Sequence, residues 1–258
     1  MNRESTSLSR ALVIYLLFAA APFATAAEWG SIKGRFVVDG APSTLPPLTI
    51  DKDEFCIANA SRKDDKVLIG KDNALVNAVV YLFLGRGGKI EIHPDYADAL
   101  KTPVEFNNKM CAFHPRVAAV RIGQPFVIKN SDPVGHNTNA ISLFNETIAA
   151  GESRTKTFDK AVILPMPVSC GMHPFMRGQL LIQDHPYMAV SGEDGTFEIK
   201  NIPVGKHVFM FWHETGYLNG VKVGAGNSVS RGKATLNIEP GKTLDLGDIK
   251  VPVSLLKR

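Results

Sequence analysis

The chain carries VSCGMHPFMRG at residues 168–178, a short segment dense in side chains that can bind a metal. Cys170, His173 and Met176 are spaced three residues apart, so one loop presents a thiol, an imidazole and a thioether. A second imidazole, His136, lies upstream, after an apolar run typical of a strand. The segment therefore predicts a metal-binding loop between strands, with His136 as a further ligand.

The donor types indicate which metal such a loop would hold. Two neutral imidazoles, one thiolate and one weak, distant thioether form the ligand set of a mononuclear type 1 copper site, which transfers electrons. Zn(II) accepts the same donors, so another metal remains an alternative. A lone buried cysteine or methionine usually only fills a core. Four donors in this order instead favour one copper ion as the cofactor.

The neighbours of the four ligands have expected roles of their own. The backbone N–H of Asn137 is expected to donate to the Cys170 sulfur, a contact that tunes a metal. His173 is expected to be the ligand nearest the surface. The side chains around it are predicted to form a docking patch for a redox partner protein, because small interfaces suit short redox encounters. This predicted patch consists of Met172, Pro174, Phe175 and Arg177.

Length and composition limit the remaining possibilities. The chain has 258 residues, 45% of them hydrophobic, which is enough for one large core or two smaller ones. Its net charge of +4 is spread out, which gives no support to nucleic acid as a partner. Residues 1–27 combine arginines, a short apolar stretch and a small-residue cleavage site. They are predicted to be a signal peptide, so we expect a periplasmic or otherwise exported protein without a membrane span after cleavage.

The number of cysteines is consistent with a protein that folds in an oxidising compartment. Of the three in the chain, Cys170 is the predicted ligand. Cys56 and Cys111 are then expected to pair as a disulfide. The alternative is that Cys111 and His114 form half of a second metal site, although the sequence shows no matching pair.

Strand patterns dominate the rest of the chain. Short extended segments with almost no helical periodicity are predicted at residues 30–40, 73–85, 117–122, 125–129, 178–183, 196–214 and 234–253. The continuous apolar run at residues 73–85 favours a buried strand. Residues 51–66 are polar and predict no regular element. This spacing of strands is typical of all-β sandwiches and barrels.

Two segments resemble a known family. CGMHPFMRG at residues 170–178 and VRIGQPFVIKNSDPVGHNTN at residues 120–139 resemble the cupredoxins, or blue copper proteins, and the loop is most like that of the amicyanins. The resemblance covers roughly residues 106–184. It implies a Greek-key β-sandwich in which the four residues named above are the copper ligands. One departure is Val168, where the family commonly has an aromatic residue two positions before the cysteine.

The flanking segments resemble a different family. GSIKGRFVVDG at residues 30–40, NALVNAVVYL at residues 73–82 and SGEDGTFEIKNIPVGKHVFMFWHETGY at residues 191–217 are similar to the carboxypeptidase regulatory-like family. That family has a transthyretin-like, or prealbumin-like, β-sandwich fold. Chains that combine both resemblances are similar to exported proteins called methylamine-utilisation proteins.

Together the two resemblances imply an all-β chain with two units. A cupredoxin Greek-key β-sandwich, residues 99–185, is inserted in or fused to a second, transthyretin-like β-sandwich. The second sandwich is expected to be discontinuous, formed by residues 28–98 and 186–258. Insertion is tolerated at loops where the chain ends lie close together.

The sequence thus predicts an exported copper protein that carries single electrons to or from a redox partner, such as a cytochrome or a quinoprotein dehydrogenase. We expect no enzyme, because the predicted site has no evident open position for a substrate and no nucleophile or carboxylate pair beside it. Two alternatives remain. One is a copper carrier or storage module. The other is a structural or adhesive exported β-sandwich protein with secondary copper binding.

Overall fold

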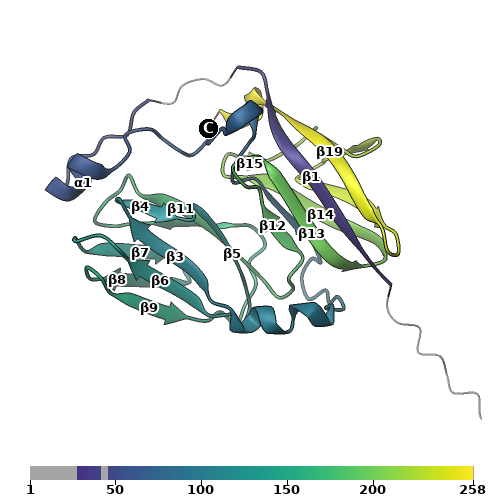
Figure 1. Ribbon diagram of the computed structural model, residues 1–258, viewed down its shortest axis with the longest axis horizontal. Helices are drawn as coiled ribbons and strands as arrows, with labels where there is room; N and C mark the ends of the chain where they lie inside the picture. Colours follow the sequence, from purple (N-terminus) through teal and green to yellow (C-terminus); the bar gives the residue numbers. More distant parts are fainter. Residues whose placement is uncertain (1–27, 42–45, 258) are drawn as a thin grey trace, which may run out of the picture.

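The computed structural model describes residues 28–41 and 46–257, and the predicted signal peptide lies outside the described residues (Figure 1). Strands form four main sheets and a two-stranded ribbon in this part of the chain. None of its helices is long and apolar enough to cross a membrane. The expectation of an all-β fold built from β-sandwiches is confirmed.

Two of the sheets contain the strands from both ends of the described chain. The first, in the order β13-β1-β19, consists of β13 (Thr196–Pro203), β1 (Trp29–Asp39) and β19 (Thr243–Pro252). The second, in the order β12-β2-β14-β15 with β18 also paired to β14, consists of β12 (Met188–Val190), β2 (Val79–Leu82), β14 (Gly205–His213), β15 (Gly216–Tyr217) and β18 (Lys233–Ile238). The ribbon joins β16 (Lys222–Val223) to β17 (Asn227–Ser228). One apolar cluster, which includes Phe36, Phe197 and Phe211, unites these two sheets.

The middle of the chain forms the other two sheets. One, in the order β5-β11-β10-β7-β8, consists of β5 (Val117–Arg121), β11 (Arg177–Gln183), β10 (Met166–Ser169), β7 (His136–Ala140) and β8 (Phe144–Ile148). The other, in the order β4-β3-β6-β9, consists of β4 (Ala112–His114), β3 (Val104–Lys109), β6 (Phe126–Asn130) and β9 (Ser153–Lys156). A second apolar cluster, which includes Phe106, Phe126 and Leu180, lies between them.

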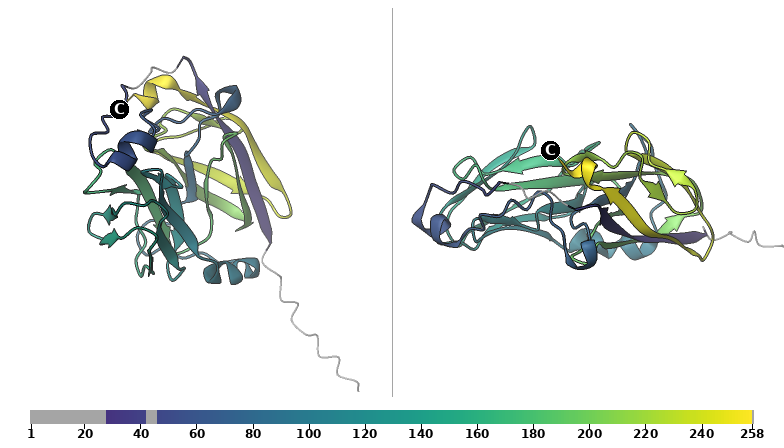
Figure 2. Two further views of the ribbon diagram at one scale, coloured as in Figure 1. Left: turned by 60° about the vertical axis from the view of Figure 1, so that its left-hand side comes forward. Right: turned by 90° about the horizontal axis from the view of Figure 1, so that it is seen from above.

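A third apolar cluster joins the two pairs of sheets. It contains Tyr81 and Trp212 from the second sheet and Leu181 from the sheet of β11. In β2 the alternate residues Val80 and Leu82 belong to the first cluster, while their neighbours belong to the third. Since side chains alternate across a strand, the inner sheets are apolar on both faces. Figures 1 and 2 show the two pairs of sheets, called the two halves below, side by side.

The strand observed within residues 73–85 is shorter than the predicted one. Only Val79–Leu82 forms β2, and the 3₁₀ turn η1 (Lys71–Asn73) precedes it. Asn73 and Asn77 have positive φ values of 57° and 65°, which lie outside the β region. The apolar run was therefore correctly predicted as buried strand, but its first part is a turn.

Short helical elements occupy the polar connections. They are α1 (Glu54–Asn59), η2 (Pro94–Tyr96) and η3 (Asp98–Lys101). A further 3₁₀ turn, η4 (Val253–Leu256), follows the last strand. The helix α1 arises where the sequence predicted no element. Ile50 and Cys56 of this region belong to the apolar cluster of the middle sheets. Part of the segment that precedes residue 99 therefore packs with the middle sheets.

A polar contact also connects the halves. Arg116 donates to both carboxylate oxygens of Glu214, at 2.7 and 3.0 Å, and also pairs with Asp65. His213, beside Glu214, is buried, and its Nδ1 accepts a hydrogen bond from the Thr215 backbone at 3.2 Å. Among the described residues, its Nε2 has no hydrogen-bond partner. Burial, together with nearby Arg116, lowers the pKa of His213 to about 3.

We expect His213 to make the fold acid-sensitive. A histidine in the unfolded chain has a pKa near 6.5, whereas the pKa of folded His213 is about 3. Between these two pH values the unfolded chain binds a proton at His213 and the folded protein does not. The unfolding free energy then falls by about 2 kcal/mol between pH 7 and pH 5 on account of this residue. Urea unfolding at the two pH values measures the effect, and His213→Gln is expected to remove it. An unchanged pH dependence in His213→Gln would contradict the assignment.

Candidate metal centre

The strand register brings the predicted ligands together. His136 is the first residue of β7, and Cys170 directly follows the last residue of β10. These strands are antiparallel neighbours, with Ser169 opposite Asn139. The loop between β10 and β11, which carries Cys170, His173 and Met176, therefore lies beside the start of β7.

The donor atoms of three of these residues lie close together. His136 Nδ1 is 3.1 Å from His173 Nδ1, and Cys170 Sγ is 3.6 Å from His173 Nδ1. The backbone N–H of Asn137 donates to Cys170 Sγ at 3.2 Å. The exposed fractions are 0% for both histidines and 1% for Cys170. The structure thus gathers two imidazoles and a thiol in a site closed to water.

Met176 belongs to the same loop. Its backbone N–H donates to the His173 carbonyl at 2.9 Å, and its carbonyl accepts from the Cys170 N–H at 3.4 Å. Its side chain is 2% exposed and lies in the same apolar cluster as Cys170. The loop therefore closes on itself, with Met176 turned inward.

Each imidazole contacts a carboxylate through its other nitrogen. His136 Nε2 lies 2.8 Å from Asp132 Oδ2, and His173 Nε2 pairs with Asp53 Oδ2. A carboxylate only accepts, so these contacts assign the ring proton of each neutral histidine to Nε2. Burial lowers the pKa of His136, which favours its neutral form although Asp132 opposes the shift. Both Nδ1 lone pairs then face each other, an arrangement that a cation between them would stabilise.

The spacing of these donors fits a single metal ion. Two nitrogens about 2.0 Å from one tetrahedral ion lie about 3.3 Å apart, and a thiolate at about 2.3 Å lies about 3.5 Å from each nitrogen. The observed separations are 3.1 Å between the nitrogens and 3.6 Å between Cys170 Sγ and His173 Nδ1. Metal-bound histidines also commonly donate their second N–H to a carboxylate. The histidine pair and the contact between His173 and Cys170 therefore have the separations expected of donors to one metal ion.

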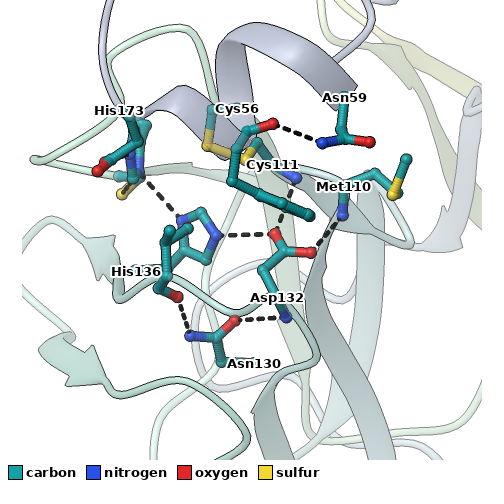
Figure 3. The surroundings of a disulfide bond; sticks show 12 residues. Cys56, Asn59, Met110, Cys111, Asn130, Asp132, His136 and His173 are labelled. Carbon is teal, nitrogen blue, oxygen red and sulfur yellow. Dashed lines mark hydrogen bonds and ion pairs between the residues drawn. A yellow bond between two sulfur atoms is a disulfide. The ribbon is translucent and has the colours of Figure 1, made fainter.

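Asp132 links His136 to the turn between β3 and β4 (Figure 3). Its carboxylate accepts from the backbone N–H groups of Met110, at 2.6 Å, and Cys111, at 2.8 Å. These two residues form a two-residue turn with φ values of 52° and 53°, a conformation that usually requires Asn or Gly. No role for Asp132 is predicted from the sequence, although Asn130-Ser131-Asp132 lies within the segment that resembles the cupredoxins. The carboxylate thus stabilises both the turn and the orientation of His136.

Cys56 and Cys111 form a disulfide, with their Cα atoms 5.6 Å apart (Figure 3). The bond attaches α1 to the turn beside the histidines. Cys56 Sγ and one ring nitrogen of each histidine, His136 and His173, lie within 4.8 Å of one another. Because Cys111 is bonded to Cys56 and His114 is exposed, the alternative of a second metal site at Cys111 and His114 is wrong.

One expectation about the surface is also wrong. His173 was expected to be the ligand nearest the surface, but it is 0% exposed, and Asp53 contacts its outer nitrogen. The reason is that α1 and the residue before it cover this side of the loop. Of the predicted docking residues, Met172 is 39% exposed. Pro174 and Arg177 are also exposed, whereas Phe175 is half-buried.

Comparisons with known proteins give matches among solved structures only. No protein-family description and no curated protein matches the chain. A copper-containing nitrite reductase from Thermus scotoductus SA-01 is 22% identical, with a TM-score of 0.29, over 31% of this chain and 22% of its own. A reduced Cu(I) form of an amicyanin variant is 18% identical, with a TM-score of 0.29, over 31% of this chain and 81% of its own. A purple cupredoxin from Nitrosopumilus maritimus is 19% identical, with a TM-score of 0.27, over 30% and 97%.

One of these solved structures is named a cupredoxin, and another is a copper-containing nitrite reductase. The chain spans less than a quarter of the nitrite reductase, and the structural scores are low. The donor geometry described above, and not these likenesses, indicates a metal centre.

Proposed function

We propose that this chain is an exported type 1 copper protein that carries single electrons. His136, Cys170, His173 and Met176 would hold one copper ion. The observation that carries the proposal is the pair of imidazole Nδ1 atoms facing each other at 3.1 Å, next to the Cys170 thiol. A bound copper ion would supply one-electron redox chemistry at this position.

The protein's own part in this function is to fix the positions of the donor atoms and to exclude water from them. Asp132 orients His136, and the Asn137 N–H donates to the Cys170 sulfur. The four proposed ligands are at most 2% exposed, so bulk water does not reach them. A site that needs little rearrangement between two oxidation states suits electron transfer better than a reaction with a substrate.

The proposed partner is another redox protein, such as a cytochrome or a quinoprotein dehydrogenase. Met172, Pro174 and Arg177 are exposed on the ligand loop and would contribute an apolar and basic docking patch, with Phe175 at its half-buried edge. Since His173 is covered by Asp53, the approach is proposed to be over Met172.

Copper storage is the second candidate function. The covered edge of His173 favours it, because a closed site retains its metal. Electron transfer requires reversible reduction and fast exchange of electrons between copies of the protein, whereas storage requires neither.

We expect purified protein to bind Cu(II) in a 1:1 ratio with an intense visible band from the thiolate. Visible spectroscopy during titration measures the stoichiometry, and voltammetry with self-exchange measurements then separates the two candidates. Fast, reversible reduction supports the electron carrier. A bound copper ion that is colourless as Cu(II) would rule out the type 1 site, and slow or irreversible reduction of a coloured site would favour storage.

A further inference from the structure

Asp53 has an unusual conformation for the residue that begins a helix. It occupies the N-cap position of α1, where aspartate normally accepts a hydrogen bond from a backbone N–H of the first turn. Here its side chain makes no capping hydrogen bond. Its backbone has φ 57° and ψ 121°, which a residue with a side chain rarely adopts. Strain of this kind persists only where the surroundings hold it, and it often marks a functional contact.

The Asp53 carboxylate contacts His173 instead of the helix. Its Oδ2 pairs with His173 Nε2, the ring nitrogen opposite the one that faces His136. The Asp53 side chain is 48% exposed, while that of His173 is 0% exposed. The carboxylate therefore lies at the boundary between the buried imidazole and the solvent.

The segment that carries Asp53 is firmly attached over the site. Cys56, three residues later, is fully buried and bonded to Cys111. Ile50 and Phe55 pack in or against the apolar cluster that contains Cys170 and Met176. Anchors on both sides of Asp53 thus hold its carboxylate against His173.

We propose that Asp53 is a positioning residue for His173, which fixes the imidazole with its proton on Nε2 and retains the metal by closing this edge. The proposal rests on the proposed copper site. Each ligand histidine then has its own carboxylate. Asp132 lies four residues before His136 in the chain, whereas Asp53 comes from a segment 120 residues away from His173.

Two substitutions separate position from charge. Asp53→Ala removes both the acceptor and the charge, while Asp53→Asn keeps an acceptor oxygen and removes the charge. Asp51→Asn is the matched control, because Asp51 is an exposed acid two residues earlier in the same segment. Urea unfolding of each metal-free variant checks that the fold is intact.

The first measurement uses metal-free protein. Nitrogen-15 spectra of the His173 ring are expected to show one tautomer, protonated at Nε2, in the unmodified protein, Asp53→Asn and Asp51→Asn. A mixture of tautomers is expected in Asp53→Ala. Identical spectra for Asp53→Ala and the unmodified protein would overturn the positioning role. This result does not depend on copper, so it is distinct from a failure of the proposed function.

The second measurement uses copper-loaded protein and a Cu(I) chelator. Asp53→Ala is expected to release copper at least about tenfold faster than the unmodified protein, the size of effect that loss of an outer contact to a ligand has. Asp53→Asn is expected to shift the copper reduction potential upward, because a negative charge that favours Cu(II) is gone. Asp51→Asn is expected to change neither quantity. Equal release rates for Asp53→Ala and Asp51→Asn would overturn the retention role.

Discussion

Replacing Cys170 with serine is expected to abolish the intense visible band of the copper-loaded protein. The band requires a thiolate bound to Cu(II), and Cys170 is the one cysteine outside the disulfide among the described residues. Its Sγ lies 3.6 Å from His173 Nδ1. We expect Cu(II) affinity to fall more than about 100-fold, beyond the 10- to 100-fold cost of losing an outer contact. Visible titrations of the two proteins measure both effects.

A substitution elsewhere in the loop serves as the control. Met172→Leu keeps an apolar side chain at an exposed position next to the ligands and is expected to leave the band in place. If Cys170→Ser kept the band, the thiolate would have to come from elsewhere and the proposed ligand set would be wrong.

Removing the disulfide is expected to have the largest effect on stability. Cys56 and Cys111 are 55 residues apart, and a loop of this length corresponds to about 4 kcal/mol of unfolding free energy in the chain-entropy account. The variant to compare is Cys56→Ser with Cys111→Ser, because a single substitution leaves a buried unpaired thiol. Urea unfolding of metal-free protein measures the loss.

The double variant also tests whether the disulfide holds α1 over the site. Copper release is expected to be faster, since the segment that carries Asp53 loses its covalent anchor. Dithiol-reduced unmodified protein is the matched comparison, and it should lose a similar amount of stability. A loss below about 1 kcal/mol in both would contradict a structural role for this bond.

The strands and the ligand loop could be predicted from the sequence because their signals are local. Alternating residues in Thr196–Pro203 and the apolar run of Val79–Leu82 reflect burial on one face or both faces of a sheet. The loop from Cys170 to Met176 has its donors within seven residues. Its position beside His136 then follows from the pairing of β10 with β7.

The cover over the site could not be predicted, because it depends on contacts between distant residues. The helix α1 has only six residues, and the N-cap side chain of Asp53 does not cap it. This helix is stabilised by packing and by a disulfide, and it has no helical periodicity that the sequence could reveal. The contact between Asp53 and His173 spans 120 residues and leaves no pattern in the sequence. Because this contact could not be predicted, His173 was expected at the surface, whereas the structure buries it.

The most direct test of the proposed centre is X-ray absorption at the copper edge of the loaded protein. The ligand set predicts two nitrogen neighbours and one short sulfur neighbour around copper, from His136, His173 and Cys170. In Cys170→Ser the sulfur neighbour should disappear while the nitrogens remain. A copper environment of nitrogen and oxygen alone in the unmodified protein would contradict the account.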